Sequence, residues 1–146
     1  MKIYVASSWR NEKQPIVVRV LRLEGHEVYD FKDPEASFHW SEIDPHWKEW
    51  APERFRESLT HSIAKHGFKR DFDAMKWAEA FVLVMPCGRS AHLEAGWAVG
   101  TGKPLAIYLS DGEPELMYSM ASKLVIGLKE MVEWAVLTAT TKARAA

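Results

Sequence analysis

The chain has 146 residues, of which 47% are hydrophobic, 27% charged and 12% aromatic, which is typical of one globular domain and excludes a disordered tail. Nineteen basic side chains nearly balance 20 acidic ones, so the formal net charge of -1 gives no general attraction to a nucleic acid polymer or an anionic membrane. Cys87 is the only cysteine, which excludes an intrachain disulfide and a zinc site built from several cysteines. We therefore expect a single domain over residues 1–146 in a reducing compartment.

Targeting signals are missing from this sequence. The segment Met1–Ala6 is too short and too polar at its flanks for a secretory signal, and no apolar run approaches the roughly 20 residues that cross a bilayer. We expect a cytoplasmic protein without a membrane partner.

The first third of the chain has the pattern of a parallel strand–helix–strand unit. Residues 2–6 are β-rich, residues 12–24 carry a helical apolar stripe that ends at Gly25, and residues 26–31 predict a second strand. Parallel pairing follows from this order of elements.

Residues 32–52 have no clear period. They contain three prolines among acidic residues, and four large aromatic side chains: Phe38, Trp40, Trp47 and Trp50. A long loop this rich in aromatics is typical of a functional lid. The alternative is that the aromatics simply cover one edge of the sheet.

The remaining sequence continues to alternate between helices and strands. We predict helices over 52–65, 70–78, 89–100, 114–121 and 128–138, strands over 80–85, 104–109 and 123–126, and a fraying tail. Five strands with intervening helices predict an α/β fold, a flavodoxin-like doubly wound five-stranded parallel sheet in the order 2-1-3-4-5.

Ligands of such sheets bind at the switch point, where the ends of strands one and three meet. The segments that we expect to face each other there are Ser7, Ser8, Trp9 and Arg10 after the first strand, and Gly88, Arg89 and Ser90 after the third. The second segment opens a helix, whose free N–H groups could bind an anion. Ser90 could equally be a simple N-cap.

Three acidic residues are candidates for chemistry in this crevice. Glu94 follows Ser90 by four residues, on the same helix face and near the N-terminus, where the helix dipole favours an ionised carboxylate. Asp71 and Asp73 open the helix predicted over 70–78, where acids are also ordinary caps. A solvated surface glutamate is the alternative for Glu94.

Cys87 is a weaker candidate. Its place at a helix N-terminus would lower the pKa of the thiol, as a nucleophile requires, but the sequence shows no paired base, and a small buried residue is the alternative. The histidines lack the spacing of metal ligands, and we expect neither a metal nor a cofactor.

Several motifs resemble the nucleoside 2-deoxyribosyltransferase family and its relatives, the nucleoside 5'-monophosphate N-glycosidases. The stretch Ile3–Arg10 is similar to the first strand and loop of the family, Asp71–Met85 to its aspartate-bearing helix and central strand, and Leu93–Ala98 with Gly102-Lys103 to its E-L-G-x-A and G-K motifs. The resemblance covers most of the chain.

The resemblance implies roles for three residues. Glu94 would be the nucleophile that attacks the anomeric carbon, Tyr4 would hold Glu94 in position, and Asp71 would protonate or bind the leaving base. Ser8 and Arg10, with the turn at residues 88–90, would suit a 5'-phosphate.

Two departures from the family pattern bear on activity. Gly88 stands where the transferases usually have an aspartate, and Glu115 stands in a segment whose asparagine reaches a neighbouring subunit in the family. We expect a homo-oligomer that cleaves or transfers the N-glycosidic bond of a small-molecule nucleoside or nucleotide. A nucleotide-binding sensor without turnover, and a redox domain that uses Cys87, are the alternatives.

Overall fold

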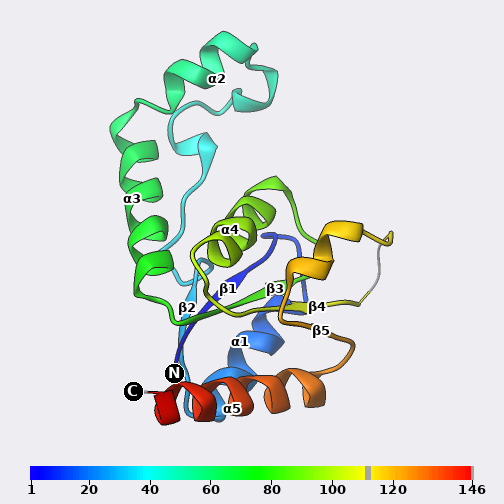
Figure 1. The fold of residues 1–146 in the computed structure, drawn as a ribbon. Coiled ribbons are helices and arrows are strands. Elements are labelled where there is room, and N and C mark those ends of the chain that lie inside the picture. The colour runs from blue at the N-terminus through cyan, green and yellow to red at the C-terminus, as the bar shows by residue number, and fades with distance from the viewer. Residues whose placement is uncertain (111–112, 146) are drawn as a thin grey trace.

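A single parallel sheet forms the centre of the molecule. The computed structural model describes residues 1–110 and 113–145, and its strands are β1 (Lys2–Ala6), β2 (Glu27–Asp30), β3 (Ala80–Val84), β4 (Leu105–Tyr108) and β5 (Lys123–Val125). Their order is β2-β1-β3-β4-β5 and every neighbouring pair is parallel (Figure 1). The predicted flavodoxin-like fold is confirmed.

Helices cover both faces of the sheet. Figure 1 shows α1 (Gln14–Leu23) and α5 (Leu128–Ala145) on one side, and α3 (Ser62–Trp77) and α4 (Arg89–Gly100) on the other. All five residues of β3 are buried, as expected of a central strand covered on both faces. In β1 the side chains alternate, so that Ile3 and Val5 join the core under α1 and α5, while Tyr4 and Ala6 join the core under α3 and α4.

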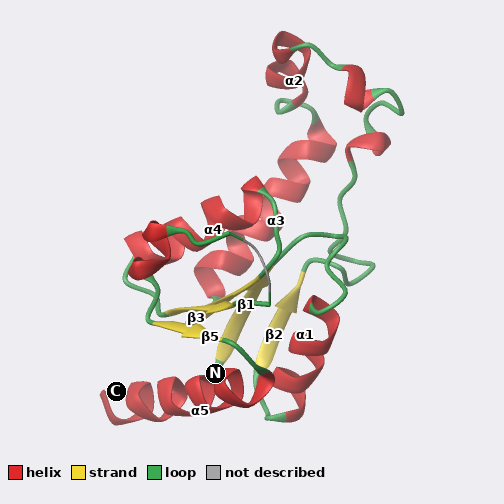
Figure 2. Ribbon diagram, turned by 90° about the vertical axis from the view of Figure 1, so that its right-hand side faces the viewer, coloured by secondary structure: helices red, strands yellow, loops and turns green. Residues whose placement is uncertain are grey.

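The segment between β2 and α3 extends away from the sheet. It holds two 3-10 turns, Trp40–Glu42 and Trp47–Glu49, and the short helix α2 (Pro52–Ser58). Figure 2 shows α2 and the start of α3 projecting well beyond the sheet. We call residues 38–59 the aromatic arm.

Packed rings hold the aromatic arm together. The Trp40 ring centroid lies 5.8 Å from that of Trp50 and 5.7 Å from that of Phe55, and Phe38 meets Trp40 edge-on at 4.9 Å. The arm meets α3 at Gly67, where an added Cβ would lie only 3.1 Å from the Phe38 ring. A glycine in the helix therefore permits the close approach of Phe38.

Several helix predictions need correction. The helix predicted over 52–65 is two helices, because α2 ends at Ser58 and α3 begins at Ser62. The helix predicted over 70–78 is the second half of α3, which begins at Ser62 because the His61 side chain accepts a hydrogen bond from the Ile63 amide. Asp71 and Asp73 therefore lie inside a long helix and do not open it. The tail predicted to fray is helical, since α5 continues to Ala145.

The C-terminal end of α3 is fixed by a lysine from another element. Lys103 Nζ donates hydrogen bonds to the carbonyl oxygens of Met75, Lys76 and Ala78 at 2.8, 2.8 and 2.6 Å. These carbonyls have no partner within the helix, and a cation at this end also opposes the negative end of the helix dipole. The Gly102-Lys103 motif thus positions the helix that carries Asp71.

Candidate active site

Polar and aromatic side chains surround a cavity of about 510 Å³. It lies beyond the carboxyl ends of β1 and β2, between the middle of α3 and the first two turns of α4. Its lining comes from the loops after β1 and β2, the aromatic arm, α3 and α4: Ser7, Trp9, Phe31, Ala36, Phe38, His39, Trp40, Ser41, Trp47, Lys48, Arg70, Asp71, Ser90 and Glu94. A cavity of this size can enclose a ligand as large as a nucleotide.

Glu94 lies on the inner face of α4 and shares the cavity with Ser90, one helical turn earlier. Burial, together with the nearby negative charge of Asp71, raises the pKa of the Glu94 carboxyl to about 8. The loss of solvent therefore opposes the ionisation that the helix dipole favours.

Tyr4 lies beside Glu94 on the α3 and α4 side of the sheet. Its ring is stacked between Tyr29 and Phe81, with centroid distances of 5.1 and 5.0 Å. The Tyr4 hydroxyl hydrogen-bonds the Glu94 carboxylate and lowers its pKa, an effect smaller than that of burial. Burial and the charges of Glu94 and Asp71 raise the pKa of Tyr4 well above its usual value, so this hydroxyl remains a hydrogen-bond donor.

Asp71 reaches the cavity from α3. The Tyr29 hydroxyl donates a hydrogen bond of 2.6 Å to Asp71 Oδ1, which fixes the orientation of the carboxylate. Burial and this contact with Asp71 raise the pKa of Tyr29. Tyr4 and Tyr29 therefore each hold one of the two acidic groups, and their stacked rings keep those groups on one side of the cavity.

Arg70 is the cavity's partly buried cation. Its side chain is 21% exposed, and the guanidinium makes long contacts of 3.5 Å with Asp71 Oδ1 and with the Ser37 carbonyl oxygen. It also interacts with the Tyr29 hydroxyl, whose pKa it lowers. Its Nε is fully buried without a hydrogen-bond partner, so only the terminal nitrogens can offer donors to the cavity.

Aromatic rings form the opposite wall. Trp9 contacts Phe31 edge-on at 5.2 Å and His39 at 4.8 Å, and Phe38, Trp40 and Trp47 of the aromatic arm complete the surface. The predicted loop therefore supplies part of the cavity wall, whereas Trp50 packs behind Trp40 and donates its indole N–H to Asp44 at 2.8 Å.

The structure brings together only some of the residues predicted for the site. Ser7, Trp9, Asp71, Ser90 and Glu94 line the cavity, and the buried Tyr4 contacts Glu94. Ser8, Arg10, Asp73, Gly88 and Arg89 do not line it. Asp73 instead forms ion pairs with Lys69 and Lys76, which lower the pKa of its carboxyl to about 2. Its prediction as a substrate-binding residue has no support in this geometry.

The start of α4 also differs from expectation. Gly88 occupies the N-cap position, so Ser90 is a helical residue and not the cap. Gly88 and Arg89 border a separate hollow together with Cys87, His92 and Leu93. Burial and the charge of Glu94 raise the pKa of the Cys87 thiol to about 11, contrary to the lowered pKa that its position suggested.

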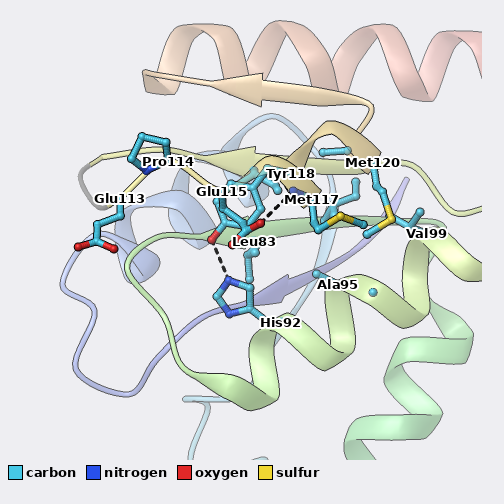
Figure 3. A pocket seen from close by; sticks show the side chains of 14 residues that line it. Leu83, His92, Ala95, Val99, Glu113, Pro114, Glu115, Met117, Tyr118 and Met120 are labelled. Atoms are coloured by element: carbon cyan, nitrogen blue, oxygen red, sulfur yellow. Dashed lines mark hydrogen bonds between the residues drawn. The ribbon is translucent and has the colours of Figure 1, made fainter.

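A second cavity, of about 500 Å³, lies on the opposite face of α4 (Figure 3). Apolar side chains such as Leu83, Val99 and Met117 line most of it, and His92 Nε2 lies 2.8 Å from the Tyr118 hydroxyl at its edge. Glu115 begins the 3-10 turn Leu116–Met120, where its carboxylate accepts a hydrogen bond from the Met117 amide. The segment predicted as a helix over 114–121 is this shorter turn.

Within the described residues, 1–110 and 113–145, no three histidine, cysteine, aspartate or glutamate side chains gather as a metal-binding group. None of the helices in those ranges has the length and apolar character needed to cross a membrane.

The fold and the site together define a doubly wound α/β protein with a pair of carboxyl groups in an aromatic crevice at the sheet's switch point. No protein-family model matches the sequence. No curated protein sequence matches it either.

Solved structures do resemble this one. A 2-deoxyribosyltransferase from the psychrotolerant bacterium Bacillus psychrosaccharolyticus superposes with a TM-score of 0.60 at 22% identity, covering 90% of each chain. The CMP N-glycosidase BcmB of Clostridium botulinum superposes with a TM-score of 0.53 at 19% identity, covering 94% of this chain and 98% of that one. At these identities the likeness establishes a common fold over nearly the whole length.

Sequence reasoning missed Arg70, Tyr29, Phe31 and Lys48 as neighbours of the acidic pair. One indication in the sequence pointed to Arg70, since it is the cation immediately before Asp71. No such indication pointed to Tyr29, because its role depends on β2 lying beside β1, where Tyr29 pairs in register with Tyr4.

Proposed function

We propose that this chain is an enzyme that cleaves or transfers the N-glycosidic bond of a nucleoside or nucleoside 5'-monophosphate, through a covalent intermediate on Glu94. The observation that carries the proposal is the arrangement of Glu94 beside Asp71 and Tyr4 in an aromatic cavity. The two similar structures, a 2-deoxyribosyltransferase and a CMP N-glycosidase, support it.

In the first step, a Glu94 carboxylate oxygen attacks the anomeric carbon of the sugar. The bond from that carbon to the base nitrogen breaks, its electron pair leaves with the base, and Asp71 protonates the base. Negative charge at Glu94 stabilises the positive charge that develops on the sugar in the transition state. The Tyr4 hydroxyl holds the carboxylate in the attacking orientation.

The raised pKa of Glu94 gives this step a source for its proton. Burial favours a proton on Glu94 in the free site, and the negative charge of Asp71 contributes to the rise in the pKa of Glu94. Transfer of the proton from Glu94 to Asp71 produces a carboxylate nucleophile and a carboxylic acid together, as the reaction requires.

In the second step, water or a second base attacks the same carbon and breaks its ester bond to Glu94. The attacking group loses its proton to the Asp71 carboxylate, which leaves Glu94 as a carboxylate and Asp71 as an acid. Return of the proton from Asp71 to Glu94 then restores the free site. Hydrolysis and transfer therefore use the same residues and differ only in the acceptor.

The walls of the cavity suit the two ends of such a substrate. Flat bases stack on aromatic side chains, and Trp9, Phe38, Trp40 and Trp47 supply such surfaces. Ser90 lies in the first turn of α4, where a phosphate or sugar oxygen could accept backbone and hydroxyl hydrogen bonds.

The test is base release from a panel of ribo- and deoxyribonucleosides and their 5'-monophosphates, with and without an acceptor base. We expect Glu94→Ala to lower release about 10³-fold or more and Asp71→Asn to lower it by about 10² to 10⁴. Glu133→Gln, at an exposed acid on α5, is the matched control and should release base at the wild-type rate.

Two outcomes would contradict the proposal. Release that persists undiminished in Glu94→Ala would remove Glu94 as the nucleophile. Tight nucleotide binding without release of any base would favour the nucleotide-binding sensor.

A further inference from the structure

The terminal nitrogens of Arg70 are only weakly engaged by the protein. Their contacts with the Ser37 carbonyl oxygen and Asp71 Oδ1 measure 3.5 Å, whereas N–H···O bonds normally measure about 2.7–3.2 Å. Nε is enclosed by the protein and is out of reach of a ligand. A partly buried guanidinium with unmet donors is costly unless a ligand completes its hydrogen bonds. Since Arg70 lines the cavity, that ligand is the molecule the cavity binds.

The position of Arg70 assigns it to the base of the substrate. It is adjacent to Asp71, the proposed proton donor to the leaving base, and it shares the cavity with Phe38 and Trp40 of the aromatic arm. Ser7 and Ser90 come instead from the β1 loop and α4. Stacked rings and the proton donor mark the base end of the cavity, and Arg70 belongs to that end.

The guanidinium can only donate hydrogen bonds, which restricts what it can recognise. A carbonyl oxygen accepts from it, whereas an amino group at the same position would bring donors against donors and leave both unpaired.

We propose that Arg70 reads a carbonyl oxygen on the leaving base, so that the site prefers bases with an oxo group at the purine 6 or pyrimidine 4 position over their amino counterparts. This inference rests on the proposed function of the same cavity. Arginine recognises the carbonyl edge of guanine in the same way in nucleic-acid complexes, and glutamine recognises the amino edge of adenine.

The same contact would assist bond cleavage. When the bond between the sugar and the base breaks, the electron pair moves onto the base and part of the negative charge reaches its carbonyl oxygen. Donation from Arg70 stabilises that charge until the proton from Asp71 neutralises the base. The preference should therefore appear in kcat as well as in KM.

The test compares inosine 5'-monophosphate with adenosine 5'-monophosphate, and uridine 5'-monophosphate with cytidine 5'-monophosphate. Within each pair the bases differ mainly by an oxo or an amino group. One pair tests purines and the other tests pyrimidines. Calorimetry measures binding to Glu94→Ala, and base release measures turnover by the protein with Glu94 intact. Arg70→Gln, Arg70→Lys and the control Lys69→Gln, at the exposed neighbour on α3, are measured alongside.

We expect the protein to prefer the oxo compound in at least one pair. Arg70→Gln should reduce that preference about 10- to 100-fold, because it weakens binding and turnover of the oxo compound and leaves those of the amino compound unchanged. Arg70→Lys should lose part of the preference, because it keeps the charge without the planar fork. Lys69→Gln should keep it in full.

The outcomes separate this inference from the proposed function. An Arg70-dependent oxo preference in binding, without any base release, would support the inference and contradict the proposed function. Release without an oxo preference, or a preference that survives in Arg70→Gln, would overturn the inference alone. Absence of both binding and release would overturn both.

Discussion

Two effects compete for the proton of Glu94. The positive end of the α4 dipole favours the carboxylate, but such an effect is worth only about 0.3–1 kcal/mol at ordinary sites. Burial and the charge of Asp71 act in the opposite direction and raise the pKa to about 8. Because each pKa unit corresponds to about 1.4 kcal/mol, the environment of the cavity outweighs the dipole several-fold.

This raised pKa predicts how stability depends on pH. The Glu94 proton is bound more tightly in the folded than in the unfolded protein, so its contribution to stability is complete below the ordinary pKa of 4.5 and is lost as pH rises through about 8. Between these values the free energy of unfolding should fall by up to about 1.4 kcal/mol per pH unit because of this residue.

Glu94→Gln keeps the shape of the side chain and removes its titration. Denaturant unfolding of wild type and variant from pH 5 to pH 8 should show that the wild type loses stability with pH more steeply than the variant does. All other titrating groups are common to both proteins. Equal pH slopes would mean that Glu94 is ionised in the free site and that our account of its environment is wrong.

At the scale of single residues, the sequence predicted those site residues that are recognised by their spacing or motif along the chain. Glu94 and Ser90 share a helix face by spacing alone, and the motif around Asp71 pointed to the second acid. Arg70 and Tyr29 could not be found in this way, because their contacts arise from packing between elements that are distant along the chain.

Among the elements, the aromatic arm depends most on one tertiary contact. Phe38 begins the arm, lines the cavity and packs over Gly67 of α3. The sequence predicted a long aromatic loop but not its direction, since that direction follows from the close approach of a ring to a helical glycine.

Gly67→Ala tests this contact. Glycine to alanine inside a helix normally stabilises by about 0.5–1 kcal/mol. At Gly67 the new Cβ would lie 3.1 Å from the Phe38 ring, so the ring must shift and the gain should be cancelled or reversed. Gly96→Ala on α4 is the matched control, because its Cβ meets nothing within 4 Å and should give the ordinary gain.

Thermal or denaturant unfolding of both variants measures the difference. The account requires Gly96→Ala to be the more stable of the two by about 1 kcal/mol or more. If the two substitutions stabilised the protein equally, Phe38 would not be held against α3 in solution.

At the scale of the whole molecule, the sheet order was predictable because each strand and helix signal was strong and right-handed parallel connections leave few topologies. The lengths of α3 and α5 were not predictable from the sequence, because the break before Ser62 and the extent of the last helix depend on caps and packing. The expected homo-oligomer stays a prediction, as does the cytoplasmic location.

The central claim of the proposed function is a covalent bond between Glu94 and the anomeric carbon of the bound sugar. The most direct measurement is mass spectrometry of peptides after acid quench of the protein during turnover of a substrate found in the panel. We predict that the peptide containing Glu94 gains the mass of the sugar moiety without its base, and that Glu94→Gln shows no such gain. Continuing base release with no sugar on Glu94 at any quench time would contradict the covalent mechanism.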